Sequence, residues 1–288
     1  MTRAGWGRPL TTTDHSRDGA GLTYVYPVVS RRAGGLSVGI NLNPNNACNW
    51  RCIYCQVPNL VRGAAPPIDL ARLEGELRAF LTGVVHGDFF ARRVPADMRR
   101  LTDLALSGNG EPTSATEFEA VIALIGRVRD NLGIDPVVKT LLITNGSLVH
   151  RAAVQAGLRR LAALNGEVWF KLDRATGVGI RAVNQTRLSP ARVRRNLEMC
   201  AGLCPTWIQT CLFAVDGAPP SPDEVDAYVE FLAALRTDAV PLRGVFLYGI
   251  ARPSLQPEAP RLTRLPETWL RALAERVEAL GFPARVAP

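Results

Sequence analysis

The fold prediction starts from GLSVGINLNPNNACNWRCIYC, residues 35–55, in which an apolar stretch runs directly into a loop with three cysteines. Residues 36–43 are typical of a buried β-strand. Cys48, Cys52 and Cys55 follow it with C-x3-C-x2-C spacing. Three thiolates on one loop can converge on one metal centre, but they are one short of the four that close a structural zinc site or an electron-transfer cluster. The spacing therefore favours a [4Fe–4S] cluster with one iron open to a further ligand.

Two other interpretations of these cysteines are weaker. The polar neighbours Asn49, Arg51 and Gln56 argue against thiols that are merely buried. A zinc site completed by a histidine is the second alternative, because histidine is a common zinc ligand. The chain has three histidines, and none belongs to a ligand pattern: His15, His86 and His150.

A second group of cysteines, Cys200, Cys204 and Cys211, lies far downstream. Cys200 and Cys204 are one helical turn apart in the apolar sequence EMCAGLC, where a free cysteine behaves as a small hydrophobic residue. We expect structural thiols here, and an auxiliary cluster is the alternative.

From residue 36 onward, strand-like apolar stretches alternate with amphipathic helical ones. The expected strands are 36–43, 101–109, 137–145, 167–173, 206–213 and 242–251, with a short last strand at 283–286. The expected helices are 67–85, 116–133, 151–164, two that begin at the Ser-Pro pairs 189–190 and 221–222, and one that ends at 281. Such alternation implies parallel strands with right-handed crossovers.

Six strand–helix units are fewer than the eight of a closed barrel. The pattern therefore predicts an α/β fold, either an open, partial (β/α)6 TIM-like barrel or a doubly wound sheet. Both place functional residues at the carboxyl ends of the strands. We expect one domain over 36–288, a partly disordered N-terminal extension over 1–35, and an insertion at 86–100.

Composition narrows the function classes further. The 288 residues carry a net charge of +8, with 34 basic and 26 acidic residues, and only two of the basic residues are lysines. The positive charge permits a nucleic-acid partner but is equally consistent with a solvated arginine-rich surface. No apolar run is long enough to span a membrane, and the polar N-terminus has no secretory signal pattern. We expect a soluble, cytoplasmic protein with no membrane partner.

The cysteine triplet, with Tyr54 before its last cysteine, resembles the signature of the radical S-adenosylmethionine (SAM) superfamily. SGNGEP at 107–112 is similar to that family's second motif, a glycine-rich turn that ends here in Glu111, with Asn109 in place of a middle glycine. More narrowly, NLNPNNACNWRCIYCQ, SGNGEPT, ITNGSL, IQTCLF and LYGIARP resemble the wyosine-type tRNA-modifying branch. The resemblance covers roughly 36–281 and implies a partial (β/α)6 barrel of the radical SAM type with parallel strands.

The resemblance also implies a chemistry. Cys48, Cys52 and Cys55 would hold the [4Fe–4S] cluster, and the amino and carboxylate groups of SAM would bind its open iron. Reduction would cleave SAM to a 5′-deoxyadenosyl radical, which abstracts hydrogen from a substrate. The substrate is left open among a tRNA base, a peptide and a small molecule, and the catalytic residues that face it are unknown.

Nine residues are expected to contact SAM on this resemblance: Tyr54, Gly108, Asn109, Gly110, Glu111, Asn145, Lys171, Asp173 and Gln209. Glycines in the 108–111 turn would expose backbone carbonyls to the SAM ammonium. Lys171 and Asp173 share one face of a strand with Trp169, and a structural ion pair is the alternative to cofactor binding. Tyr54 and Asn145 have the alternatives of a packing aromatic and a turn residue. Arg252 is the candidate for an anionic substrate group.

A cluster reduced in each turnover needs an electron donor, and an acidic flavodoxin or ferredoxin is the expected reductant. RNA stays open as a substrate. The alternative from a different class is a non-catalytic iron–sulfur electron carrier or a cluster-dependent sensor. A carrier normally has a fourth nearby cysteine, and none lies between Cys55 and Cys200.

Overall fold

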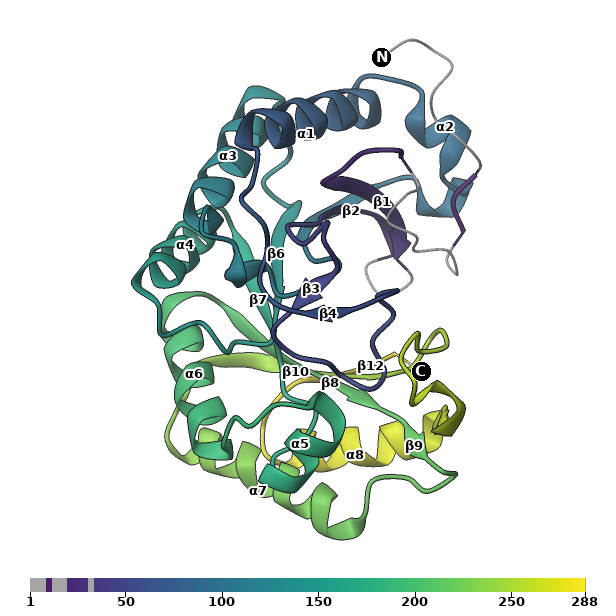
Figure 1. The fold of residues 1–288 in the computed structure, drawn as a ribbon, viewed down its shortest axis with the longest axis vertical. Helices are drawn as coiled ribbons and strands as arrows, with labels where there is room; N and C mark the ends of the chain where they lie inside the picture. The colour runs from purple at the N-terminus through teal and green to yellow at the C-terminus, as the bar shows by residue number, and fades with distance from the viewer. Residues whose placement is uncertain (1–8, 12–19, 31–33, 288) are drawn as a thin grey trace.

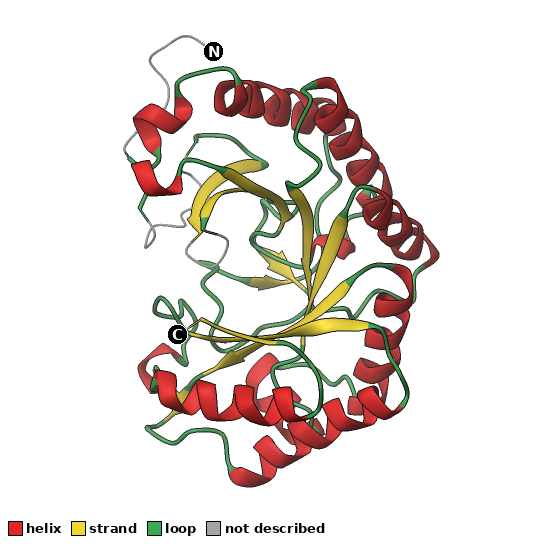
Figure 2. Ribbon diagram, turned by 180° about the vertical axis from the view of Figure 1, so that it is seen from behind, coloured by secondary structure: helices red, strands yellow, loops and turns green. Residues whose placement is uncertain are grey.

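An eight-stranded sheet curves into an open half-barrel with helices around its outside (Figures 1 and 2). The computed structural model describes residues 9–11, 20–30 and 34–287. The strand order is β1-β2-β5-β6-β7-β8-β10-β12. Only the β1–β2 pair is antiparallel, and every other neighbouring pair in this sheet is parallel.

The strands of the sheet are β1 (Val25–Ser30), β2 (Gly35–Ile40), β5 (Leu101–Leu106), β6 (Lys139–Thr144), β7 (Gly166–Lys171), β8 (Thr206–Leu212), β10 (Leu242–Gly249) and β12 (Ala284–Ala287). Two small pairs lie outside it: β3 (Ala47–Cys48) with β4 (Val61–Arg62), and β9 (Ala214–Val215) with β11 (Leu262–Thr263). The six expected core strands and the short last strand are all present, so the predicted partial barrel with parallel strands is confirmed.

The α-helices are α1 (Leu70–Val85), α2 (Phe89–Arg93), α3 (Phe118–Asn131), α4 (Ala152–Ala163), α5 (Gly177–Asn184), α6 (Pro190–Leu203), α7 (Pro222–Thr237) and α8 (Glu267–Ala279). The Ser-Pro pairs begin α6 and α7 as expected. The side chains of Ser189 and Ser221 accept hydrogen bonds from the backbone N–H groups of Arg192 and Glu224, which satisfies donors that a helix start leaves unpaired.

Alternation along the strands separates the packed face from the concave face. In β7, Val168 and Phe170 are fully buried in the core that the helices cover, whereas Trp169 and Lys171 point to the concave side and are partly exposed. The same alternation in neighbouring strands leaves a cavity on the concave side. The sheet therefore positions the residues at its carboxyl edge around one space.

Neither β1 nor α5 was anticipated from the sequence. β1 lies inside the expected N-terminal extension and extends the sheet by pairing with β2. α5 is short and contains Gly177 and Gly179, which weaken a helix signal; a hydrogen bond from the Gly179 N–H to the Thr176 side chain supports its start. The expected insertion contains α2 and a 3-10 turn at Ala96–Met98. The expected disorder at 1–8, 12–19 and 31–33 lies outside the described residues.

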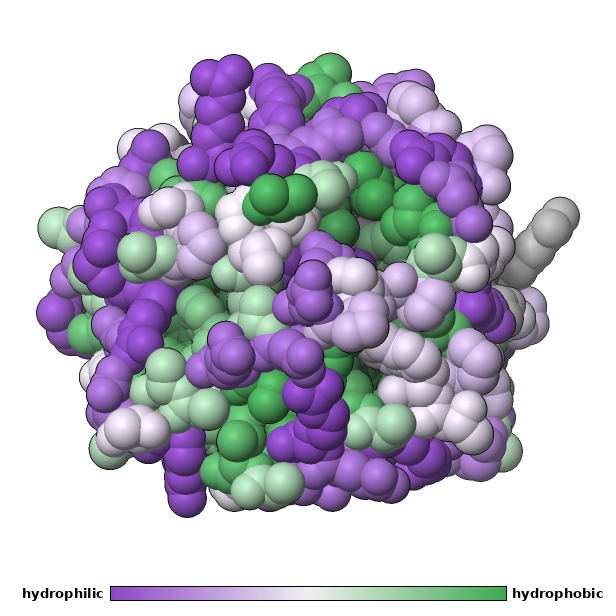
Figure 3. All heavy atoms as spheres, turned by 90° about the horizontal axis from the view of Figure 1, so that it is seen from below, coloured by the Kyte–Doolittle hydropathy of each residue, from purple (hydrophilic) through white to green (hydrophobic). Residues whose placement is uncertain are grey.

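No helix within the described residues has the length and apolar character that crossing a bilayer would require. Figure 3 views the molecule from below and shows hydrophilic residues over much of that face, with hydrophobic residues in smaller areas between them.

Candidate functional site

A cavity of about 300 Å³ lies on the concave side of the sheet, at the carboxyl ends of several parallel strands. Its walls come from β1, β2, β5, β6 and β7 and from the loops that follow the parallel strands. Of the residues expected from the sequence, those that line it are Cys48, Cys52, Tyr54, Cys55, Gly108, Asn109, Gly110, Glu111, Asn145, Lys171 and Arg252. Asp173 and Gln209 are not among the lining residues.

The three cysteines of the loop face this cavity as free, half-buried thiols. Burial raises the pKa of Cys48 to about 11 and that of Cys52 to about 12. Two donors already point at sulfur: the Trp50 backbone N–H lies 3.5 Å from Cys48 Sγ, and Asn184 Nδ2 lies 3.3 Å from Cys52 Sγ. Among the described residues, no three His, Cys, Asp or Glu side chains are gathered tightly enough to hold a metal ion. The three thiols therefore line one cavity, but their arrangement in this structure does not form a metal-binding group.

Two distant segments hold the cysteine loop in place. On one side, the backbone N–H groups of Arg51 and Ile53 donate to the carbonyls of Asn184 and Val183, at the end of α5. On the other side, the Ser254 hydroxyl donates to the Ile53 carbonyl at 2.7 Å, and the segment after β10 continues along the loop. The loop is therefore fixed by tertiary contacts rather than by its own sequence.

The glycine-rich turn packs against the residues that precede the cysteines. A Cβ on Gly110 would lie 2.0 Å from the Ala47 carbonyl oxygen, and one on Gly108, whose φ is +149°, would lie 2.3 Å from Asn41 Oδ1. Only glycine allows this approach. The Asn109 amide donates through Nδ2 to Asn46 Oδ1 at 2.6 Å, while Asn109 Oδ1 is buried and has no hydrogen-bond partner in the described structure. The turn thus contains a buried acceptor without a partner, in a residue that lines the cavity.

Glu111 is buried and its carboxylate is held by several protein donors. Oε1 accepts hydrogen bonds from the hydroxyls of Thr113 and Thr144, each at 2.6 Å, and Oε2 accepts one from the Asn145 N–H at 2.7 Å. Burial raises the pKa of Glu111, and these hydrogen bonds oppose the rise. Through these hydrogen bonds, Glu111 connects the glycine-rich turn to the end of β6.

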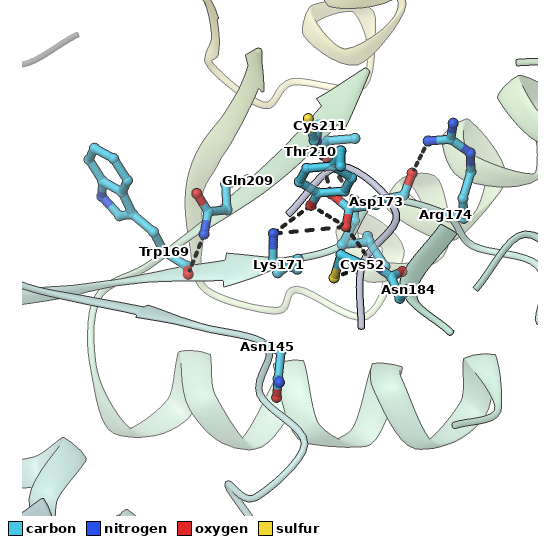
Figure 4. Close-up of polar contacts among 12 residues, drawn as sticks. Cys52, Asn145, Trp169, Lys171, Asp173, Arg174, Asn184, Gln209, Thr210 and Cys211 are labelled. Carbon is cyan, nitrogen blue, oxygen red and sulfur yellow. Dashed lines mark hydrogen bonds and ion pairs between the residues drawn. The ribbon is translucent and has the colours of Figure 1, made fainter. Parts of the chain in front are cut away.

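Lys171, Asp173 and Tyr54 belong to one buried network, and Figure 4 shows Lys171 and Asp173 close together within it. Lys171 Nζ donates to the Tyr54 hydroxyl at 2.5 Å, and that hydroxyl donates to Asp173 Oδ2 at 2.6 Å. Asn184 Nδ2 also donates to Asp173 Oδ2 at 2.6 Å, and the Cys211 N–H donates to Oδ1 at 2.9 Å. Lys171 Nζ is 3.9 Å from Asp173 Oδ2. Burial alone would lower the pKa of Lys171, but the Asp173 carboxylate keeps it above its usual range.

Two of the expected residues lie apart from this network. Gln209 is buried, and its Nε2 donates to the Trp169 carbonyl at 3.2 Å. Asn145 follows β6, and its Nδ2 donates to Asn49 Oδ1 at 2.8 Å, which links it to the cysteine loop. Figure 4 shows Asn145 separated from the group around Asp173.

The three downstream cysteines are buried, and none of them lines the cavity. Cys200 and Cys204 are part of the main hydrophobic core, and Cys211 lies in a smaller apolar cluster with Tyr54 and Phe213. The expected structural role fits these positions, because the thiols pack among apolar side chains.

Tyr26, Val28 and Ser30, which β1 brings to the cavity wall, were not expected from the sequence. Tyr26 lies over Gly39, and its hydroxyl is 2.9 Å from Ser107 Oγ. The alternating β-rich pattern YVYPVVS at 24–30 was the available signal.

No family model matches the chain. UPF0026 proteins from Helicobacter pylori strains 26695 and J99 are 33% and 32% identical to it over 149 residues, which is 51% of this chain and 41% of each relative. The matched region thus spans less than half of these relatives. A GTPase Obg from Brachyspira hyodysenteriae is 27% identical over 135 residues, which is 17% of that protein.

Solved structures share the fold over most of this chain. SuiB from Streptococcus suis bound to S-adenosylmethionine aligns with a TM-score of 0.53 at 12% identity, over 89% of this chain and 49% of SuiB. TYW1 with a lysine-pyruvate adduct bound aligns at 0.53 and 14% identity, over 86% and 74%. A radical SAM methyltransferase from Sphaerobacter thermophilus aligns at 0.57 and 16% identity, over 88% and 66%. The fold is that of the radical SAM enzymes, as the sequence resemblance predicted.

Proposed function

We propose that the chain is a radical SAM enzyme whose cavity binds a [4Fe–4S] cluster and SAM. The observation that carries the proposal is that Cys48, Cys52 and Cys55 line the same cavity as the 108–111 turn, at the carboxyl ends of the strands. The fold shared with solved radical SAM enzymes supports it.

The residues around the thiols fit an iron–sulfur cluster. Thiolates are its usual ligands, and three on one loop leave one iron for SAM. The hydrogen bonds from Trp50 and Asn184 to sulfur are of the kind that tunes cluster ligands. Burial raises the pKa values of Cys48 and Cys52, so binding the metal must displace their protons.

The cofactor end of the cavity offers groups suited to SAM. Asn109 Oδ1, buried and unpartnered, is an acceptor near the glycine-rich turn for the SAM ammonium. Lys171 lines the wall as a cation for the SAM carboxylate. Tyr54 and Asn145 complete this end of the wall. Asp173 and Gln209 do not line the cavity. We assign them the role of positioning residues that do, because Asp173 accepts a hydrogen bond from Tyr54 and Gln209 donates one to the Trp169 carbonyl.

When bound and reduced, the cluster supplies the electron that cleaves SAM to a 5′-deoxyadenosyl radical for hydrogen abstraction from the substrate. The protein's own residues orient the cofactor and exclude water. Trp50, Val57 and Ile143 contribute apolar surface to the cavity wall. A low-water cavity limits side reactions of a reactive intermediate.

The substrate is expected at the far end of the cavity, where Ser30, Ser37 and Trp169 line the wall. A tRNA base, a peptide or a small molecule are the candidate classes, with Arg252 available at the cavity for an anionic group. All six cysteines are free thiols, which fits a reducing compartment such as the cytoplasm.

Iron content and electron paramagnetic resonance (EPR) spectra of two variants test the proposal. Cys52→Ala is expected to lose the cluster after anaerobic reconstitution, because only two loop thiols remain. Cys204→Ala is the matched control, since it removes a thiol buried in the core, and it is expected to keep the iron content of the wild type.

Adding SAM to the reduced wild type is expected to change the EPR spectrum, because SAM would bind the open iron. If the cluster is bound but its EPR spectrum does not change when SAM is added, the protein would instead be an electron carrier or sensor. Zinc in place of iron would contradict the proposal, and iron loss in Cys204→Ala would indicate an auxiliary cluster.

A further inference from the structure

The outer side of the cysteine loop is covered by a surface that the reaction in the cavity does not use. It joins the end of α5 to β4 and to the segment after β10. We name it the α5 face and define it by Arg51, Val61, Arg62, Val178, Arg181, Gln185, Arg187, Leu255 and Glu258.

Gln185 connects the three segments of the α5 face. Arg51 Nε donates to Gln185 Oε1 at 2.8 Å, and Gln185 Nε2 donates to Glu258 Oε1 at 2.9 Å. Arg62 donates through Nη2 to the Gln185 carbonyl. Residues far apart in the sequence therefore form one continuous surface.

The charge of the α5 face is strongly positive. Arg181 and Arg187 are exposed, and within the described structure neither forms an ion pair. Arg62 is exposed and bonds to carbonyl oxygens, which do not neutralise its charge. Arg51 pairs with Glu258, the single carboxylate among the residues that define this face, at 2.7 Å. Among the residues that define the face, four guanidinium groups thus stand against one carboxylate, and the nearby Glu224, which lies against Gly179 of α5, pairs with Arg174.

Exposed apolar side chains lie among these cations. Val61, Val178 and Leu255 are 52%, 69% and 56% exposed, and they are three of the five large hydrophobic residues that are exposed in the described structure. Val178 and Arg181 are three residues apart on α5 and therefore share one side of the helix. Apolar residues beside charged ones are typical of a protein–protein contact.

The α5 face also lies directly over a predicted cluster ligand. Asn184, next to Gln185 in the chain, is buried and donates through Nδ2 to Cys52 Sγ at 3.3 Å (Figure 4). Its carbonyl accepts a hydrogen bond from the Arg51 N–H at 3.3 Å. One residue thus connects the surface to a thiol of the cavity.

We infer that the α5 face is the docking site for an acidic protein that carries a one-electron redox centre. The inference rests on the proposed function, in which each reductive cleavage needs one electron from outside. That electron leaves the reduced flavin or iron–sulfur centre of the donor, which is oxidised, and enters the cluster, which is reduced. The arginines of the α5 face attract an acidic donor by their positive charge, and Val61, Val178 and Leu255 provide apolar contact area.

Single-stranded RNA fits the α5 face less well. Such sites combine positive charge with exposed aromatic rings on which bases stack. None of the aromatic side chains in the described structure is exposed, and the apolar residues of this face are aliphatic.

Charge reversal tests the inference. The variant Arg181→Glu/Arg187→Glu is compared with wild type for binding of an acidic [2Fe–2S] ferredoxin, and for cluster reduction followed by absorbance with reduced ferredoxin or with dithionite. The variant is expected to bind ferredoxin about tenfold or more weakly, and its ferredoxin-driven rate is expected to fall by a similar factor relative to its own dithionite-driven rate. Raising the salt concentration should weaken wild-type binding more than variant binding.

Arg159→Glu/Arg195→Glu is the matched control, because it reverses two exposed arginines on α4 and α6 that form no ion pair within the described residues. It is expected to behave as wild type. An equal loss in both double variants would mean that net charge alone steers the donor, and would overturn the inference, as would an unchanged ferredoxin-driven rate in the α5 variant.

Competition between ferredoxin and a short single-stranded RNA on the wild type would assign the face to RNA and overturn the inference. Cluster reduction is measured without SAM turnover. The docking site is therefore tested independently of SAM cleavage. If the protein cleaves no SAM with dithionite, that result contradicts the proposed function but not the docking site.

Discussion

Asp173 is a buried residue whose carboxylate holds several residues of the candidate site together. Its carboxylate accepts hydrogen bonds from Tyr54, Asn184 and the Cys211 N–H, and it lies beside Lys171. The alternation of β7 predicted that Lys171 and Asp173 share a face. The partners Tyr54 and Asn184 could not be predicted, because Tyr54 is 119 residues away in the chain and nothing local to either residue signals the contact.

Asp173→Asn is expected to lower the free energy of unfolding by about 3 kcal/mol, because the amide turns one acceptor into a donor and leaves Lys171 without its charge partner. Urea unfolding of the cluster-free protein measures this loss. Asp216→Asn is the control, since Asp216 and its partner Arg261 are exposed, and little change is expected there. Equal effects at the two positions would contradict the network's role in stability.

The buried thiol Cys200 makes stability depend on alkaline pH. Burial raises its pKa from 9.0 to about 12. Because the folded pKa is the higher one, the unfolded chain releases this proton first as the pH rises. The contribution of Cys200 is therefore fully present below about pH 9 and is lost progressively as the pH rises toward 12.

Cys200→Ala is accordingly expected to lose less stability than wild type between pH 9 and pH 10.5, by up to about 1.4 kcal/mol per pH unit. Urea unfolding of both cluster-free proteins at pH 7, 9 and 10.5 measures the difference. A constant difference between the two proteins at all three values would show that Cys200 titrates alike in both states.

At the scale of elements, the strands that the sequence predicted are those rich in apolar and β-branched residues, such as β8, whose seven residues are all buried. α5 escaped prediction because its two glycines weaken the helical signal, although the end of this helix holds the cysteine loop. β1 escaped because its pattern was interpreted as part of an extension. Both elements depend on tertiary contacts more than on local propensity.

The packing of Tyr26 on Gly39 gives a test of β1. A Cβ at Gly39 would lie 2.1 Å from the Tyr26 ring, across the antiparallel pair. Gly39→Ala is expected to cost about 2 kcal/mol in wild type, since the ring must move out of its place.

In a Tyr26→Ala background, Gly39→Ala is expected to cost much less, because the obstructing ring is gone. Urea unfolding of the two single variants and the double variant gives the coupling free energy. Additive costs would show that β1 does not pack on β2 as described.

The fold class of the whole molecule was predictable because two independent signals agree. The strand–helix alternation implied a parallel sheet, and the triplet of Cys48, Cys52 and Cys55 together with the 108–111 turn indicated which edge carries the candidate site. The cavity then collects side chains from five strands, which only the curvature of the sheet brings together. Wall residues such as Ser30 and Ser37 carry no motif, so their place in the site could not be predicted from the sequence.

Formation of 5′-deoxyadenosine by the anaerobically reconstituted protein, with SAM and dithionite, tests the central claim most directly. A variant with alanine at Cys48, Cys52 and Cys55 serves as the control. We expect 5′-deoxyadenosine from the wild type and none from the control. No 5′-deoxyadenosine from a wild type that holds a full [4Fe–4S] cluster, or equal amounts from both proteins, would contradict the account.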